Sequence, residues 1–198
     1  MHASIGTVAE QFRITTNLFM KAMSGIETAE AMRRPGPISN PLLWLAGHVT
    51  HFRTRLLTIV GVPRDFPWGS VFDTGAKVGP PELYPAPEEI VAVWEETSGL
   101  LIQRLAVLTE DDLSAPPVAR VPSTDATLRG AIGYFSLHEA YHVGQMVYLA
   151  KLWVGDRWDS LSIPMGQSAA FNARLAASST PYSATAYLEK PGGGNTRS

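Results

Sequence analysis

The longest helical pattern in the chain, from about Asp125 to Val154, carries two histidines four residues apart on its apolar side. If unbroken, a helix of this length measures on the order of 45 Å, and Ser123 or Thr124 is suited to cap its start. Side chains at i and i+4 lie one turn apart on the same helical face. We therefore expect His138 and His142 to face the core together, where both imidazoles can reach one metal ion.

Three other stretches show helical periodicity and have recognisable start or stop signals. The first runs from about Ser4 to Thr28, and the second from Pro41 to about Val60, with Asn40 as its N-cap. The third follows Pro87. With the long stretch they predict an all-α chain folded as a four-helix bundle over residues 1–160.

Two segments lack this periodicity. The loop between the second and third helices, residues 62–86, is rich in Pro, Gly and aromatic residues, and we interpret it as a packed cover over one end of the bundle. We expect Trp68 or Phe72 to line the approach to a metal there. Residues 161–198 form an irregular extension that we expect to pack on the bundle or on a dimer partner, with a short helix from Met165 to Ala177.

Composition excludes several classes of function and site. There is no cysteine, so histidine and carboxylate are the strong metal ligands that remain. A net charge of −2 gives no basic footprint for nucleic acid, and no apolar run approaches the roughly 20 residues that span a bilayer. The first residues contain neither a basic leader nor an apolar block, so we expect a cytoplasmic protein.

A third histidine, His48, lies near the middle of the second helix, with Trp44, Leu45 and Phe52 at helical spacing around it. It can meet His138 and His142 at a similar depth in a bundle. Without a metal ion, three buried imidazoles need three separate sets of hydrogen-bonding partners, because each unsatisfied group costs roughly 1–3 kcal/mol. One divalent ion per chain would satisfy all three and keep open coordination positions.

Nearby polar residues have alternative interpretations. His51 is out of line with His48, so solvent or a partner subunit is its expected neighbour. Glu139, at the edge of the buried face, suits a salt bridge or support of a ligand better than direct ligation. Gln145 faces inward, either holding a metal-bound water or simply packing between helices. Glu139, Tyr141 and Gln145 are the candidate acid–base groups. Three tryptophans are most simply core residues: Trp44, Trp94 and Trp153.

Residues 138–142, HEAYH, also match the H-E-x-x-H pattern of zinc peptidases, in which the glutamate is the general base. The extended form of that pattern requires glycine and histidine where this chain has Gln145 and Tyr148. Glu189 is the only later glutamate that could complete the ligand set. A peptidase is therefore the weaker alternative.

The sequence NPLLWLAGH at residues 40–48 combined with HEAYHVGQ at residues 138–145 resembles the DinB-like superfamily. Residues 66–69 and 108–113 are similar to other stretches of this group, and the likeness spans about residues 5–158. The resemblance implies a four-helix bundle of up-down-down-up arrangement and frequent homodimers. It also implies a divalent metal, most often nickel or zinc, held by histidines matching His48, His138 and His142.

The resemblance implies no single reaction. Relatives include thiol-dependent S-transferases and isomerases that use mycothiol or bacillithiol. Our first hypothesis is a metal-dependent enzyme of transferase or hydrolase type that acts on a small-molecule substrate such as a thiol conjugate. The alternative is a non-catalytic metal-binding or stress-response module.

Overall fold

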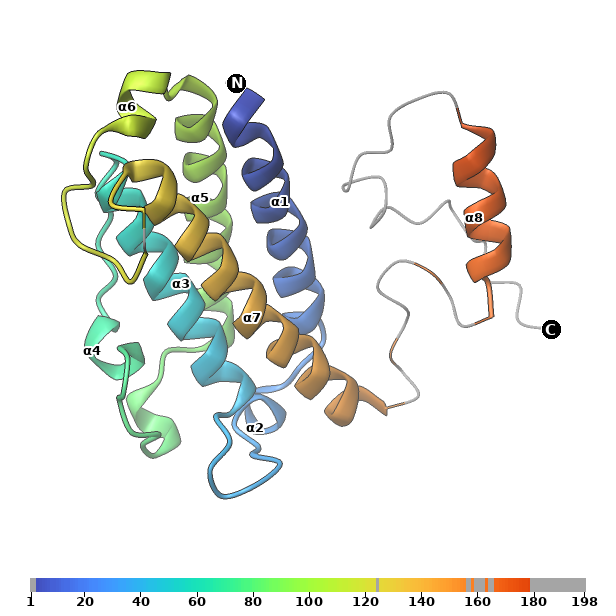
Figure 1. The fold of residues 1–198 in the computed structure, drawn as a ribbon. Coiled ribbons are helices and arrows are strands. Elements are labelled where there is room, and N and C mark those ends of the chain that lie inside the picture. Colours follow the sequence, from blue (N-terminus) through green and yellow to red (C-terminus); the bar gives the residue numbers. More distant parts are fainter. Residues whose placement is uncertain (1–2, 124, 156–157, 159–162, 164–165, 179–198) are drawn as a thin grey trace.

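The computed structural model describes residues 3–123, 125–155, 158, 163 and 166–178. Helices are the only regular secondary structure among these residues, which confirms the predicted all-α class (Figure 1). In chain order they are α1 Ala3–Met23, α2 Thr28–Ala31, α3 Leu42–Ile59, α4 Gly69–Phe72, the 3-10 turn η1 Pro81–Leu83, α5 Pro87–Val107, α6 Glu110–Ser114, α7 Leu128–Val154 and α8 Ser168–Ala177.

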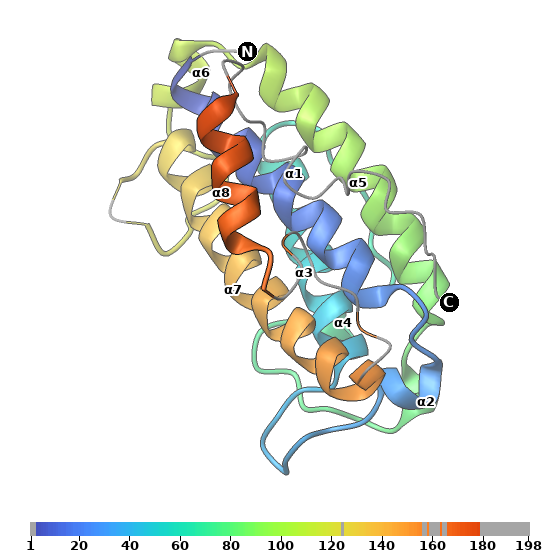
Figure 2. The same cartoon turned by 90° about the vertical axis from the view of Figure 1, so that its right-hand side faces the viewer.

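Helices α1, α3, α5 and α7 form the bundle. Helix α1 contacts α5 and α7, and α3 contacts the same two helices, so α1 and α3 occupy opposite corners. Figure 2 shows α1 with α5 and α7 on its two sides. One apolar cluster joins the starts of α1 and α7 to the ends of α3 and α5, through Ile5, Ile132, Leu56 and Leu105. Helices α1 and α7 therefore run in one direction, and α3 and α5 in the other.

Several helix boundaries differ from the sequence-based prediction. Helix α1 ends at Met23, earlier than predicted, and Gly25 follows in a left-handed conformation with φ 69°. Helix α3 has Pro41, not Asn40, at its N-cap position. Helix α7 begins at Leu128, and its cap is Thr127, whose hydroxyl accepts from the Gly130 backbone N–H at 3.2 Å. The predicted cap, Ser123, is therefore wrong, and Thr124 lies outside the described residues.

The segment 62–86 lies beside the first half of α3, where its short helix α4 packs (Figure 1). The segment approaches α3 closely at Gly47, where an added Cβ would overlap the Phe72 ring. The Trp44 indole N–H donates to the Val71 carbonyl at 3.2 Å and holds the segment in place. The segment therefore packs along the side of α3, next to His48.

The C-terminal region is described only in part. Helix α8 coincides with most of the short helix predicted from Met165 to Ala177, and it has no buried residue. Residues 179–198, which we expected to contact a dimer partner, lie outside the described residues. The division at residue 160, the homodimer and the cytoplasmic location stay predictions. No helix in the described part of the chain is long and apolar enough to cross a membrane.

Candidate metal centre

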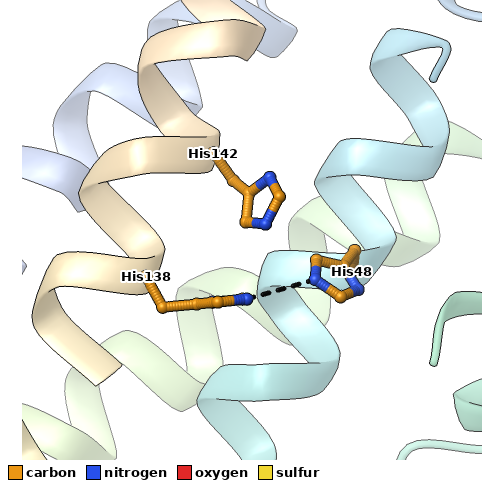
Figure 3. Close-up of side chains that lie close together, drawn as sticks. All are labelled: His48, His138 and His142. Atoms are coloured by element: carbon orange, nitrogen blue, oxygen red, sulfur yellow. Dashed lines mark hydrogen bonds between the residues drawn. The ribbon is translucent and has the colours of Figure 1, made fainter. Parts of the chain in front are cut away.

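His48 on α3 meets His138 and His142 on α7 between the two helices (Figure 3). One ring nitrogen of each histidine lies within 4.8 Å of the other two, and the Nε2 atoms of His48 and His138 are 3.3 Å apart. Two nitrogens bound about 2.0–2.1 Å from one ion in tetrahedral geometry lie ~3.4 Å apart. The pair thus has the spacing of metal ligands, and a ring nitrogen of His142 lies within 4.8 Å of both.

The orientation of His48 is fixed by its neighbours. Its Nδ1 lies 2.6 Å from the Phe72 carbonyl oxygen, which can only accept, so Nδ1 carries the proton. The ring also stacks on Trp44, with centroids 4.8 Å apart and planes 13° apart. Because Nδ1 is the donor, the Nε2 lone pair is free to ligate, as is common for metal-binding histidines.

His138 and His142 are oriented by different contacts. The His138 ring stacks on Phe52, with centroids 4.1 Å apart, and its Nδ1 is buried with no hydrogen-bond partner among the described atoms. The Nδ1 of His142 lies 3.3 Å from the Gln145 side-chain oxygen, an arrangement that leaves Nε2 for a metal. Gln145 therefore supports a histidine, an outcome not included in its two sequence-based interpretations.

Burial keeps the three imidazoles neutral. It lowers the pKa of His48, although the Phe72 carbonyl partly opposes this effect. Burial, followed by repulsion from the other two histidines, lowers the pKa of His138 to about 3. For His142, burial and then His48 lower the pKa to about 4. Neutral imidazole is the form that binds metals, so the cluster is ready for ligation at neutral pH.

Glu139 points into the core on another face of α7. It is only 4% exposed, and its carboxylate pairs with Arg53 while accepting from the Thr15 hydroxyl. The Arg53 Nε–H donates to Oε2 at 2.9 Å, and Nη2 donates to Oε1. This confirms the predicted salt bridge. Because both oxygens are occupied, Glu139 cannot serve as the base of a zinc peptidase, and we discard that alternative and the acid–base role of this residue.

Sequence reasoning missed Arg53, the centre of a polar network in the core. Its side chain is fully buried, and it also donates to Thr16 and Ser98. The guanidinium carbon lies 3.6 Å from the centroid of the Trp94 ring, a cation–π contact. Helical spacing could have identified it, because Arg53 lies four residues after Val49 and four before Leu57. Both are core residues, so all three lie on one face of the helix.

A cavity of about 650 Å³ opens at His142, between α7 and the segment 35–40. Gln145 and Tyr141 line it, whereas Trp68 and Phe72 do not. The prediction that one of these aromatic residues lines the approach is therefore wrong for this cavity. The Phe72 side chain is instead fully buried and packs against Gly47. Its backbone carbonyl is the part that contacts the site, because it lies beside Nδ1 of His48.

The other sequence candidates lie outside the cluster. His51 is half-buried, stacks on Phe66 with centroids 5.6 Å apart, and has its Nε2 4.0 Å from the Asp73 carboxylate. It is not part of the three-histidine group. Trp44 and Trp94 are core residues as predicted, whereas Trp153 is only partly buried.

Comparisons with known proteins agree with this architecture. A family model described as the DinB superfamily matches residues 11–146. A solved structure titled as a conserved protein of locus from Enterococcus faecalis has a TM-score of 0.62 and 17% sequence identity, covering 79% of this chain and 99% of its own. At this identity the likeness shows the fold alone. No curated protein matches the chain.

Proposed function

This chain belongs to the DinB superfamily, and on that basis we propose that it binds one divalent ion, nickel or zinc, through His48, His138 and His142. The observation that carries the proposal is the meeting of three neutral imidazoles from two helices. In His48 and His142, Nδ1 lies beside an oxygen that accepts its proton in a hydrogen bond, so the lone pair on Nε2 is available to bind a metal.

The alternative of three ordinary core histidines fits the contacts less well. His138 has no partner at Nδ1, and at Nε2 it faces the Nε2 of His48, whose proton is already on Nδ1. A hydrogen bond from the Nε2–H of His138 to the Nε2 of His48 would satisfy this pair, but it would not explain why a ring nitrogen of His142 also lies within 4.8 Å of both. A shared ion explains the approach of one nitrogen from each of the three histidines.

Three protein ligands would keep coordination positions open, which is typical of catalytic rather than structural metal sites. We propose that the protein is a metal-dependent transferase or hydrolase whose small-molecule substrate, such as a thiol conjugate, occupies the cavity at His142. A bound ion would lower the pKa of a thiol or water held there. The role of His48, His138 and His142 is to hold the ion, and that of Phe72 and Gln145 is to orient two of them.

A specific observation favours the second candidate function, a metal-binding module without turnover. In the described part of the chain, no carboxylate or lysine that could transfer a proton lines the cavity at His142, and Glu139 is paired with Arg53. Screening metal-loaded protein against thiol conjugates, esters and amides separates the two functions. Turnover that is lost in the His142→Ala variant identifies the enzyme.

The metal proposal is tested by reconstitution with Ni²⁺ or Zn²⁺, removal of excess ion and elemental analysis. We expect about one ion per chain in the wild-type protein. Each His→Ala change at positions 48, 138 and 142 should abolish it, whereas the control His51→Ala should keep it, since His51 lies outside the cluster. Full metal retention by His48→Ala would remove that residue from the site.

A further inference from the structure

The cavity at His142 contains a feature that metal binding does not require. Tyr141, Gly144 and Tyr148 lie on one face of α7, at helical spacings of three and four residues, and all three line the cavity. The two tyrosines are 61% and 62% exposed. A Cβ added at Gly144 would meet no atom within 4 Å, so the helix backbone is open there. We call the part of the cavity lined by Tyr141, Gly144 and Tyr148 the tyrosine slot.

The wall opposite the tyrosine slot is the segment 35–40, including Pro35, Ile38 and Asn40. Arg34 holds this segment, since its Nε–H donates to the Ser39 carbonyl at 2.6 Å and its Nη2 donates to the Pro37 carbonyl. The wall is therefore fixed by hydrogen bonds of its own. A preformed wall lowers the entropy cost of binding a small molecule.

The lining of the cavity determines what chemistry it can recognise. Among the residues that the structure describes, no Lys, Arg, Asp or Glu lines it; apart from His142, its polar side chains are the tyrosine hydroxyls, the Ser39 hydroxyl and the amides of Asn40 and Gln145. A charged ligand would find no counterion here, whereas tyrosine faces bind flat aromatic groups. A volume of about 650 Å³ is in the range of small-molecule sites.

We propose that the tyrosine slot binds an uncharged small molecule with an aromatic ring, which lies over Gly144 between Tyr141 and Tyr148. Its polar end reaches the ion at His142. This inference rests on the proposed metal site and adds the substrate class: neutral and aromatic rather than anionic.

The test uses two probes with the same metal-binding head, benzohydroxamate and acetohydroxamate, titrated by calorimetry into nickel-loaded protein. Only benzohydroxamate has a ring, so we expect it to bind about tenfold tighter to the wild-type protein. A third probe, 4-carboxybenzohydroxamate, should lose this advantage because its carboxylate has no counterion in the cavity.

The matched variants are Gly144→Leu, which fills the tyrosine slot, and Gly133→Leu, which places the same side chain on α7 away from it. A Cβ meets no atom within 4 Å at either glycine, so both variants should fold. Gly144→Leu should lower the affinity for benzohydroxamate to that for acetohydroxamate. The affinity for acetohydroxamate itself should not change. Gly133→Leu should behave as the wild type.

The outcomes separate the two proposals. Equal binding of both probes, with nickel retained, overturns the tyrosine slot and leaves the metal site intact. Failure of the protein to hold nickel overturns both.

Dimerisation is a third outcome, because Leu137 and Leu152 extend the exposed apolar face of α7. A wild-type dimer that Gly144→Leu converts to a monomer would identify the slot as a subunit interface and overturn the proposal.

Discussion

Arg53 and Glu139 form a buried ion pair across the interface of α3 and α7, one residue along α7 from His138. The pair therefore joins the two helices that carry the three histidines. Thr15 of α1 and Ser98 of α5 bond to the same two charged groups, so all four bundle helices contribute to this level of the core. Such a network fixes the relative positions of α3 and α7, on which the spacing of the histidines depends.

The first prediction concerns this ion pair. Arg53→Met should lower the free energy of unfolding by about 3–5 kcal/mol, because it leaves the Glu139 carboxylate buried without its cation. Urea denaturation monitored by circular dichroism measures the loss. In the double variant Arg53→Met/Glu139→Leu no unpaired charge remains, and most of the stability should return. A double variant as unstable as the single one would show that the pair itself provides the stability.

The second prediction concerns the close approach of α3 and α4. Gly47→Ala should destabilise the protein by about 1–3 kcal/mol, because its methyl group would displace the Phe72 ring. The same movement removes the Phe72 carbonyl from His48, so nickel affinity should fall as well. The control is Gly99→Ala in α5, where a Cβ meets nothing within 4 Å. There alanine should stabilise the helix by about 0.5–1 kcal/mol.

The third prediction concerns the support of His142. Gln145→Leu removes the acceptor at Nδ1 without touching Nε2, so nickel should still bind, about 10–100-fold more weakly. Competition with a chelator of known affinity measures the change. Gln145→Glu keeps an acceptor at that position and should bind at least as tightly as the wild type. Unchanged affinity in the leucine variant would mean that Gln145 does not orient the ring.

Much of the site could be predicted because helical spacing is a local property. The i,i+4 relation between His138 and His142 holds in any α-helix, and the apolar residues around His48 indicated its inward face. The convergence of the three residues was predicted from these two facts and is found in the structure. Their binding of a metal stays a prediction.

The parts that were missed depend on contacts between distant segments. Arginine on a helix usually extends into solvent, so the burial of Arg53 is explained only by Glu139, 86 residues away. The path of the segment 62–86 follows from the fit of Phe72 on Gly47, which no periodicity encodes. The cap of α7 was misplaced because several polar residues precede the helix, and the choice of Thr127 depends on the path of the chain before it.

The fourth prediction concerns the stability of the metal-free protein as a function of pH. In the folded chain the pKa of His138 is lowered from 6.5 to about 3 and that of His142 to about 4, mainly by burial. The unfolded chain takes up protons near pH 6.5, where the folded chain does not. The free energy of unfolding therefore keeps its full value above about pH 6.5. Below that pH, protonation of the unfolded chain lowers it, by at most about 1.4 kcal/mol per pH unit for each histidine as the pH falls toward 4.

Urea denaturation at pH 7.5, 6, 5 and 4.5 measures this decrease. Replacing His138 and His142 by asparagine removes two of the groups that cause it, so the double variant should lose less stability over the same range. His48 and His51, whose pKa values burial also lowers, account for part of the remaining decrease. A double variant with the same pH dependence as the wild type would show that these two imidazoles are not buried as neutral groups. It would thereby remove the physical basis for their readiness to bind metal.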